Sequence, residues 1–366
     1  MAQVRRWAST NAPSSPDLFI LLAATPSASI VMRPPKTTVA IISPALRKAN
    51  NGNWQTAYRW SRFLRAACEV SLETEWSPAD HPGKPPACMI ALHARRSADT
   101  VGRFAKACPG SPLVVVLTGT DLYRDIRTDE CAQRSLDLAT HLVVLQEEGP
   151  AELASHHRTK CRVIYQSAPA LTPGTPNQRT FDVVLVGHMR AEKDPLTPMR
   201  ALEWLPDDSP VRLIHIGDAL ENEYLRAAQA LQARAWPTVG RYLWQAGLPH
   251  HDTRQRIRRA QAMVISSVIE GGANVIIEAV TAGVPVLASR IPGNIGMLGR
   301  DYNGYFAPGD CRELARLLDR ASRDPAFLSL LQRQCARRAP LFAPAREQAE
   351  VIRLVTDALS RPDTLQ

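Results

Sequence analysis

Short apolar runs alternate with longer amphipathic segments along most of the chain. Runs of about four to eight residues that are apolar on both faces are typical of strands in a parallel sheet covered by helices. The pattern therefore predicts an α/β protein built on parallel sheets. The predicted strands are 38–43, 87–94, 112–118, 141–145 and 161–165, and then 181–187, 211–217, 262–267 and 284–289.

Apolar residues at helical spacing fill the intervals between these runs. Residues 57–67, for example, place Trp60, Phe63 and Leu64 on one helical face. Further helices are predicted near 195–204, 221–234, 274–282, 310–320 and 343–359.

A segment rich in proline and polar residues, 169–180, separates two sets of strands and is interpreted as a linker. We therefore expect two Rossmann-like domains, 37–168 and 181–342, followed by a C-terminal helical segment, 343–366. Ligands of such sheets bind at the carboxyl ends of the strands. With two domains facing each other, the expected site is the cleft between them.

The chain of 366 residues carries a formal net charge of +9, most of it from arginine. An excess of positive charge favours anionic partners such as nucleic acid, phosphates or a membrane surface. The positive residues are scattered, however, and no nucleic-acid-binding motif is visible. A basic, non-enzymatic nucleic-acid-binding protein is therefore only the second alternative, and no nucleic-acid partner is expected.

Seven cysteines are scattered without a C-x-x-C pair, which indicates reduced thiols in a cytoplasmic protein and no metal site. No apolar stretch is long enough to span a bilayer, so integral membrane association is not expected. Residues 1–36 differ from the rest, with two arginines, a short apolar run and several prolines. We interpret this segment as a disordered extension rather than a secretory signal.

The most informative segment follows the strand predicted at 262–267. Glu270 and Glu278 are separated by seven residues, and their carboxylates suit the hydroxyls of a hexose or a ribose. N–H groups at the start of the next helix, which Asn274 is predicted to cap, attract phosphate. The small and polar residues of the turn itself are Gly271, Gly272, Ala273, Asn274 and Val275. This combination indicates a nucleotide-sugar site.

Two basic residues follow the strand predicted at 181–187. Arg190 and Lys193 lie near the start of the next helix, where a guanidinium and an ammonium can bind a diphosphate. Metal-independent stabilisation of a leaving diphosphate needs such cations, and no D-x-D motif is visible. Trp244, in the segment 240–247, is a candidate wall for the nucleotide base.

The segment EGGANVIIEAVTAGVPVLAS, together with NGYFAPGD at 303–310, resembles the E-x7-E region of the family-four glycosyltransferases, which have the GT-B fold. The resemblance extends over residues 38 to about 360. It implies that Glu270 contacts the donor sugar and Glu278 the nucleotide ribose. It also implies that Arg190 and Lys193 neutralise the departing diphosphate, and that a helix within 343–359 crosses back to the first domain.

The loop 44–56 follows the first predicted strand and opens a helix. Neither G-x-x-x-x-G-K-[ST] nor G-x-G-x-x-G is present, which argues against a P-loop enzyme and a dinucleotide oxidoreductase. A cationic, amide-rich loop at a helix start, with Asn53 as a predicted cap, is a good site for a small anion. We expect the acceptor to bind to Arg47, Lys48, Asn50, Asn51, Gly52, Asn53 and Thr56.

The segment RKANNGNWQTAYRW, residues 47–60, resembles the selenosugar synthases of selenoneine biosynthesis, a branch of the same superfamily. This resemblance implies transfer of a hexosyl group from UDP-glucose or UDP-N-acetylglucosamine to selenophosphate. Selenophosphate is charged and nucleophilic at neutral pH, so it needs little help from a general base. The UDP-sugar is then a substrate, and no cofactor is expected.

Asp121, after the strand 112–118, is a candidate catalytic base or hydroxyl ligand, and His93 also follows a strand end. The first alternative is a family-four glycosyltransferase for a hydroxyl acceptor of a polysaccharide or lipid precursor, which would depend more on such a base. Gln166 lies beside the linker and is a candidate for lining the cleft. His215 is predicted as a core residue, and the surface residues are predicted to include His156, His157, His250 and His251.

Overall fold

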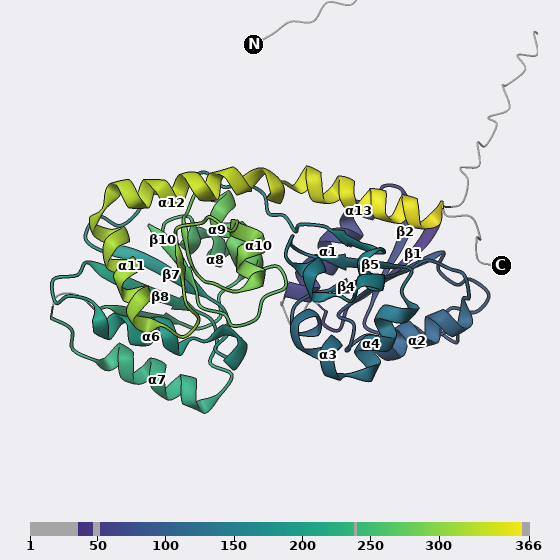
Figure 1. Cartoon of the computed structure of the whole chain (residues 1–366), viewed down its shortest axis with the longest axis horizontal. Helices are drawn as coiled ribbons and strands as arrows, with labels where there is room; N and C mark the ends of the chain where they lie inside the picture. The colour runs from purple at the N-terminus through teal and green to yellow at the C-terminus, as the bar shows by residue number, and fades with distance from the viewer. Residues whose placement is uncertain (1–35, 47–51, 238–239, 361–366) are drawn as a thin grey trace, which may run out of the picture. The chain divides into compact units, whose positions relative to one another are not determined.

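The computed structural model of the chain describes residues 36–46, 52–237 and 240–360. Within them, two α/β lobes are each built on a sheet of six parallel strands (Figure 1). This is the α/β architecture predicted from the apolar runs. Residues 1–35 of the predicted extension lie outside the described residues, and the exact domain limits drawn from the sequence stay a prediction.

The first sheet has the strand order β2-β1-β3-β4-β5-β6. Its strands are β1 (Thr37–Ile42), β2 (Cys68–Glu73), β3 (Cys88–Leu92), β4 (Leu113–Leu117), β5 (His141–Val144) and β6 (Cys161–Val163). The connecting helices and turns are α1 (Gly52–Leu64), α2 (Ala98–Ala107), η2 (Asp121–Asp125), α3 (Ile126–Thr128), α4 (Glu130–Leu138), η3 (Gly149–Glu152) and α5 (Ser155–Arg158). All residues of β3, β4 and β5 are buried, because helices cover both faces of the sheet.

The second sheet has the order β12-β11-β10-β7-β8-β9. Its strands are β7 (Phe181–Val186), β8 (Val211–Ile216), β9 (Tyr242–Gln245), β10 (Ala262–Ile265), β11 (Val286–Ser289) and β12 (Tyr305–Phe306). Its helices and turns are η4 (Ala191–Lys193), α6 (Leu196–Ala201), η5 (Leu202–Trp204), α7 (Asn222–Ala233), α8 (His250–Ile257), α9 (Asn274–Thr281), α10 (Pro292–Leu298), α11 (Cys311–Arg323), α12 (Pro325–Arg338) and η6 (Ala339–Phe342).

The strands that the apolar runs did not predict are β2, β9 and β12, and each lies at the edge of its sheet. Residues of an edge strand are covered less completely than those of a central strand, so polar residues are tolerated among them. In β2 only Cys68 is buried, and in β9 only Tyr242. A search for continuous apolar runs therefore misses β2 and β9, whereas β12 is buried but has only two residues, too few to form such a run.

The last helix, α13 (Pro344–Leu359), leaves the second lobe and packs on α1 of the first lobe (Figure 1). Val351, Leu354 and Val355 of α13 are buried in the same apolar cluster as Trp60 and Leu64 of α1. The helix is therefore part of the core of the first lobe, although the chain reaches it only after completing the second lobe.

Glu347 in the first turns of α13 forms the main polar contact of this crossing. Its carboxylate is 1% exposed and accepts hydrogen bonds from Arg59 Nε at 2.6 Å and Arg59 Nη2 at 3.0 Å. It also accepts bonds from Trp60 Nε1 at 2.8 Å and from Ser167 Oγ at 2.5 Å. A buried charge is tolerated only when it is paired and hydrogen-bonded, and this carboxylate meets both conditions. Glu347 thus joins α13, α1 and the segment before the linker.

Two further ion pairs join the lobes beside α10. Arg300 of the second lobe donates to both carboxylate oxygens of Glu148 at 2.8 and 2.7 Å, and Arg338 donates to Glu147 at 2.9 Å. Arg300 and Glu147 are well exposed, so each pair contributes little by itself. The buried contacts of α13 are therefore the stronger link.

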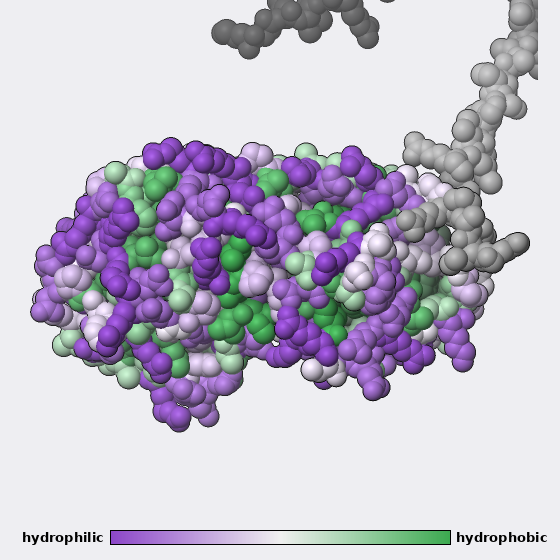
Figure 2. Space-filling view, in the orientation of Figure 1, coloured by the Kyte–Doolittle hydropathy of each residue, from purple (hydrophilic) through white to green (hydrophobic). Residues whose placement is uncertain are grey.

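No helix among the described residues is both long enough and apolar enough to cross a bilayer. The face drawn in Figure 2 is mostly hydrophilic, with apolar side chains in several groups rather than in one continuous belt.

His215 lies inside the second lobe on β8 and is 1% exposed. One ring nitrogen lies 3.0 Å from the Tyr242 hydroxyl and the other lies 3.3 Å from the carbonyl oxygen of Gly187. Burial lowers the pKa of His215 from 6.5 to about 4, because the charged imidazolium would lose its hydration. The ring is therefore neutral near pH 7 and contacts the loop that follows β7.

We expect Glu347→Gln to lower the free energy of unfolding by about 3 kcal/mol, because the partly buried Arg59, whose side chain is 19% exposed, would lose its counter-ion. The matched control is Glu350→Gln on the same helix, whose pairing with Arg353 at 3.5 Å is exposed and should contribute less than about 1 kcal/mol. Urea unfolding of the two variants measures the difference. Equal losses of stability would contradict the central role of Glu347.

We also expect His215 to make the protein sensitive to acid. In the unfolded chain the pKa is near 6.5, so the unfolded state binds the proton first and stability falls as the pH drops from about 6.5 to about 4. The loss should total about 3 kcal/mol, at about 1.4 kcal/mol for each pH unit. His215→Asn should lower stability at pH 7 but flatten this slope. Chemical unfolding at several pH values tests this, and an unchanged slope would contradict it.

Candidate nucleotide-sugar cleft

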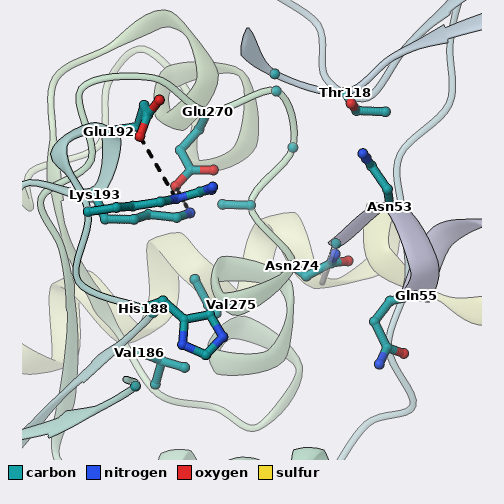
Figure 3. Close-up of a pocket in the computed structure, with 18 of the residues that line it drawn as sticks. Asn53, Gln55, Thr118, Val186, His188, Glu192, Lys193, Glu270, Asn274 and Val275 are labelled. Atoms are coloured by element: carbon teal, nitrogen blue, oxygen red, sulfur yellow. Dashed lines mark hydrogen bonds and ion pairs between the residues drawn. The ribbon is translucent and has the colours of Figure 1, made fainter. Parts of the chain in front are cut away.

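A cleft of about 760 Å³ lies between the two lobes. Its walls come from the segments after β1, β3 and β4 in the first sheet and after β7, β8 and β10 in the second. These are the carboxyl ends of parallel strands, where ligands of such sheets bind. Figure 3 shows Glu270 and Lys193 on one side of the cleft, with Asn53 and Thr118 opposite them.

Glu270 and Lys193 form an ion pair on the wall of the second lobe. Lys193 Nζ lies 2.5 Å from Glu270 Oε1, and the same oxygen accepts a bond from Ser267 Oγ at 2.6 Å. Glu270 is 9% exposed and both recorded bonds fall on Oε1. The carboxylate is thus held in one orientation next to the cation that faces the cleft.

The turn that carries Lys193 is fixed by residues outside it. Asp194 has a left-handed backbone, with φ of 42°, and its carboxylate caps α6 through Thr197. Ser266, directly after β10, donates to the carbonyl oxygens of Lys193 at 3.0 Å and Asp194 at 2.8 Å. Non-glycine residues adopt this conformation only when the surroundings hold them there. The position of Lys193 is therefore set by the end of β10.

Arg190 also lines the cleft and is about half exposed, with its Nε 4.0 Å from a carboxylate oxygen of Glu192. Glu192 in turn lies 3.6 Å from Arg124 of the first lobe. Two cations of the second lobe, Arg190 and Lys193, therefore face the same opening.

Glu278 lies in α9 and is 7% exposed. His250 Nε2, at the start of α8, lies 2.6 Å from Glu278 Oε1. The N-cap position of α9 is Ala273, which offers no side-chain bond to the first N–H groups of the helix. Asn274 is the first residue of α9 and not its cap, so the predicted capping role is corrected. These N–H groups face the cleft beside Val275, where an anion can accept from them.

The glycines of the turn before α9 bring the two lobes into backbone contact. A Cβ atom added to Gly271 would lie 2.3 Å from the carbonyl oxygen of Thr118, and one added to Gly272 would lie 2.6 Å from Leu145 Cβ. Cβ atoms do not approach other atoms this closely. Both glycines are therefore needed for the observed contact between the second lobe and the first.

Asp121, predicted as catalytic, lies beneath the first-lobe wall and is 0% exposed. Its carboxylate accepts backbone N–H bonds from Ala94, Thr118 and Gly119 at 2.8 to 3.0 Å. Asp121 is not among the residues that line the cleft, and both of its carboxylate oxygens already accept hydrogen bonds from backbone N–H groups. The predicted direct contact of Asp121 with substrate does not match its buried place beneath the wall.

His93 lies beside Asp121, and its Nδ1 accepts a hydrogen bond from the backbone N–H of Arg96 at 3.3 Å. It lines the cleft, has a left-handed backbone with φ of 72°, and its Nδ1 lies 3.9 Å from an Asp121 oxygen. Its Nε2 lies 3.2 Å from Thr120 Oγ1. A strained, buried histidine at a strand end is typical of a functional site.

The predicted acceptor loop is only partly described. Gly52, Asn53 and Thr56 line the cleft at the start of α1, whereas Arg47, Lys48, Asn50 and Asn51 lie outside the described residues. The helix begins at Gly52, so Asn53 lies within its first turn rather than at the predicted cap. Thr56 Oγ1 accepts a bond from Gln166 Nε2, and Gln166 also lines the cleft.

Trp244, predicted as the wall for the base, does not line the cleft. It lies on β9, packs against the core of the second lobe, and donates from Nε1 to the carbonyl oxygen of Gly217 at 2.9 Å. Trp244 is part of the edge strand β9, so its side chain packs within the second lobe and not in the site. The residues that follow it and do face the cleft are Gly247, Leu248, Pro249 and His250.

The cleft brings together most of the residues predicted for the nucleotide sugar. These are Arg190, Lys193, Glu270, Gly271, Gly272, Ala273, Asn274, Val275 and Glu278. His250, predicted as a surface residue, also lines the cleft, and it was missed because a histidine in a polar segment carries no periodic or motif signal. For His93 and Gln166 the available signal was their place after a strand end and beside the linker.

Part of the chain matches a known family model. Residues 173–341 match the model described as Glycosyl transferases group 1. Glycosyltransferase 1 domain-containing protein 1 of Xenopus tropicalis is 30% identical over 138 residues, which are 37% of this chain and 39% of that protein. The chain therefore matches well under half of the length of this relative.

Solved structures are similar over most of the chain. Anabaena HepE, in a crystal structure with UDP and glucose, has a TM-score of 0.70 at 15% identity, covering 88% of this chain and 100% of that one. Sucrose-phosphate synthase from Thermosynechococcus elongatus has a TM-score of 0.72 at 17% identity, covering 88% and 99%. Residues 173–341 thus resemble the glycosyl transferases group 1, and the described chain has the GT-B fold.

Proposed function

We propose that this chain is a glycosyltransferase that moves a hexosyl group from a UDP-sugar to selenophosphate. The observation that supports a UDP-sugar as donor is the placement of Glu270 and Glu278, which both face one cleft beside the start of α9. HepE, which shares the fold, was crystallised with UDP and glucose. These points support UDP-glucose, or its N-acetylamino analogue, as donor.

In this proposal the diphosphate binds to the N–H groups at the start of α9, with Arg190 and Lys193 beside it. Glu278 accepts hydroxyl hydrogens of the ribose, and Glu270 accepts those of the sugar. When the bond between the anomeric carbon and the diphosphate oxygen breaks, UDP takes the electron pair. The two cations stabilise that charge most strongly in the transition state, which is what accelerates the reaction.

The character of the first-lobe wall supports an anionic acceptor. Among the described residues, the first lobe lines the cleft with the basic side chains His93 and Arg96 but with no aspartate or glutamate. An alcohol acceptor must lose a proton as it attacks and gains from a carboxylate base. An acceptor that is already ionised needs no such base, and a basic wall attracts it.

Selenophosphate is the acceptor that the loop 47–60 suggests through its resemblance to selenosugar synthases. Its selenium would attack the anomeric carbon, so that a C–Se bond forms as the C–O bond to UDP breaks. Water attack on phosphorus would then break the Se–P bond and give the free selenosugar and inorganic phosphate.

The second candidate is transfer to a hydroxyl acceptor. The observation that favours it is the position of His93, which lines the cleft at the end of β3, where a histidine can accept the proton of an attacking hydroxyl. In this case the acceptor hydroxyl would approach His93 from the cleft.

The product of the purified full chain distinguishes the candidates. With selenophosphate and a panel of UDP-sugars, we expect mass spectrometry to show UDP and a hexosyl product containing selenium. The control is Glu270→Gln, which should keep UDP binding but lose at least about tenfold in turnover if one hydrogen bond to the transition state is weakened. Products formed only with alcohols would favour the second candidate. Failure to bind any uridine nucleotide would contradict the donor assignment.

We further expect His250→Ala to weaken UDP binding, because His250 orients the carboxylate of Glu278 from 2.6 Å. Loss of one charge-assisted hydrogen bond should raise the Kd about tenfold, equivalent to about 1.4 kcal/mol. The adjacent exposed residue provides the control, since His251→Ala removes the same side chain outside the cleft. Titration calorimetry with UDP measures both variants. Equal affinities would contradict the role given to His250.

A further inference from the structure

A cluster of two histidines and an aspartate lies on the first lobe, apart from the residues that line the cleft. Asp137 belongs to the last turn of α4, and His156 and His157 belong to α5. One ligand atom from each of the three residues lies within 4.8 Å of the other two. The sequence predicted these histidines as plain surface residues, because nothing in it shows that α5 returns to the end of α4.

The geometry of the cluster is close to that of a metal site. His157 Nε2 lies 2.9 Å from Asp137 Oδ1, and the rings of His156 and His157 lie 3.9 Å apart at 47°. Two ligand atoms on one tetrahedral zinc lie about 3.3 Å apart, given bonds of about 2.0–2.1 Å. A cation can therefore replace the proton between Asp137 and His157 with little movement.

The burial of the three side chains suits a site that is anchored on one side and open on the other. The side chain of His157 is 9% exposed and that of Asp137 is 66% exposed, while His156 is exposed. His157 is thus fixed in the fold, and water can reach the remaining coordination position. Such a set offers three protein ligands and one exchangeable position.

Some charges around the cluster favour a bound cation and others oppose it. The carboxylate of Asp137 favours a bound cation, whereas the positive charge of Lys160, close to His157, disfavours it. The ammonium of Lys160, however, is held by the carbonyl oxygens of Leu136 at 2.7 Å and Ala139 at 2.7 Å, at the negative end of α4.

We propose that Asp137, His156 and His157 form a binding site for a divalent transition-metal ion of the zinc type, which would tie α4 to α5. Two imidazoles and one carboxylate suit Zn²⁺, Co²⁺ or Ni²⁺. Mg²⁺ and Ca²⁺ prefer oxygen ligands and should not bind. The site is separate from the glycosyl-transfer cleft and does not depend on the function proposed for it.

The test uses the untagged full chain after treatment with a chelator. Titration calorimetry with ZnCl₂ should show one site per chain, and Co²⁺ should give the visible absorption of a protein-bound ion. Asp137→Asn and His156→Ala change exposed side chains, so both variants should fold, and each should raise the Kd for zinc at least tenfold. Zinc should raise the Tm of the wild type but not of these two variants.

His251→Ala is the matched control, because it removes one histidine from the other His-His pair of the chain. It should bind zinc as the wild type does, and MgCl₂ should leave the Tm of every variant unchanged. The proposal is overturned if the wild type binds no zinc, or if Asp137→Asn and His156→Ala bind it as tightly as His251→Ala.

Discussion

The buried carboxylate of Glu347 links the end of the chain to one wall of the cleft. It binds Arg59 and Trp60 of α1, and α1 begins at Gly52, in the wall itself. It also binds Ser167, one residue after Gln166, which lines the same wall. Since the charge cannot be left without partners in the interior, α13, α1 and the segment before the linker are held as one unit. The first-lobe wall of the cleft is therefore held in place by residues that are far apart in the sequence.

Inside the cleft, each of the two acidic residues of the E-x7-E segment is already paired. Glu270 contacts Lys193, and Glu278 contacts His250. Such pairing reduces the cost of keeping two carboxylates in a partly buried place. In both pairs the contact falls on Oε1, so Oε2 of each carboxylate can accept a hydrogen bond from a ligand hydroxyl while the pair stays intact.

The sequence predicted the parts of the molecule that depend on regular patterns. The fully buried strands, such as β3 and β4, follow from their apolar runs, and the turn before α9 follows from its spacing of carboxylates and glycines. The ends of the predicted strands indicate where a site lies, but the sequence does not show in which direction a side chain there points. In the structure the side chain of Asp121 lies beneath the first-lobe wall of the cleft, and the side chain of Trp244 packs against the core of the second lobe. The pairing of His250 with Glu278 joins residues 28 positions apart, which no local pattern reveals.

The glycine contact between the lobes has a consequence for how substrates enter and leave. With Gly271 seated against the carbonyl of Thr118, the turn that would hold the diphosphate also lies against the first lobe. Any wider opening of the cleft would have to break this contact first, so the entry of a ligand larger than the present opening would depend on a movement of the two lobes.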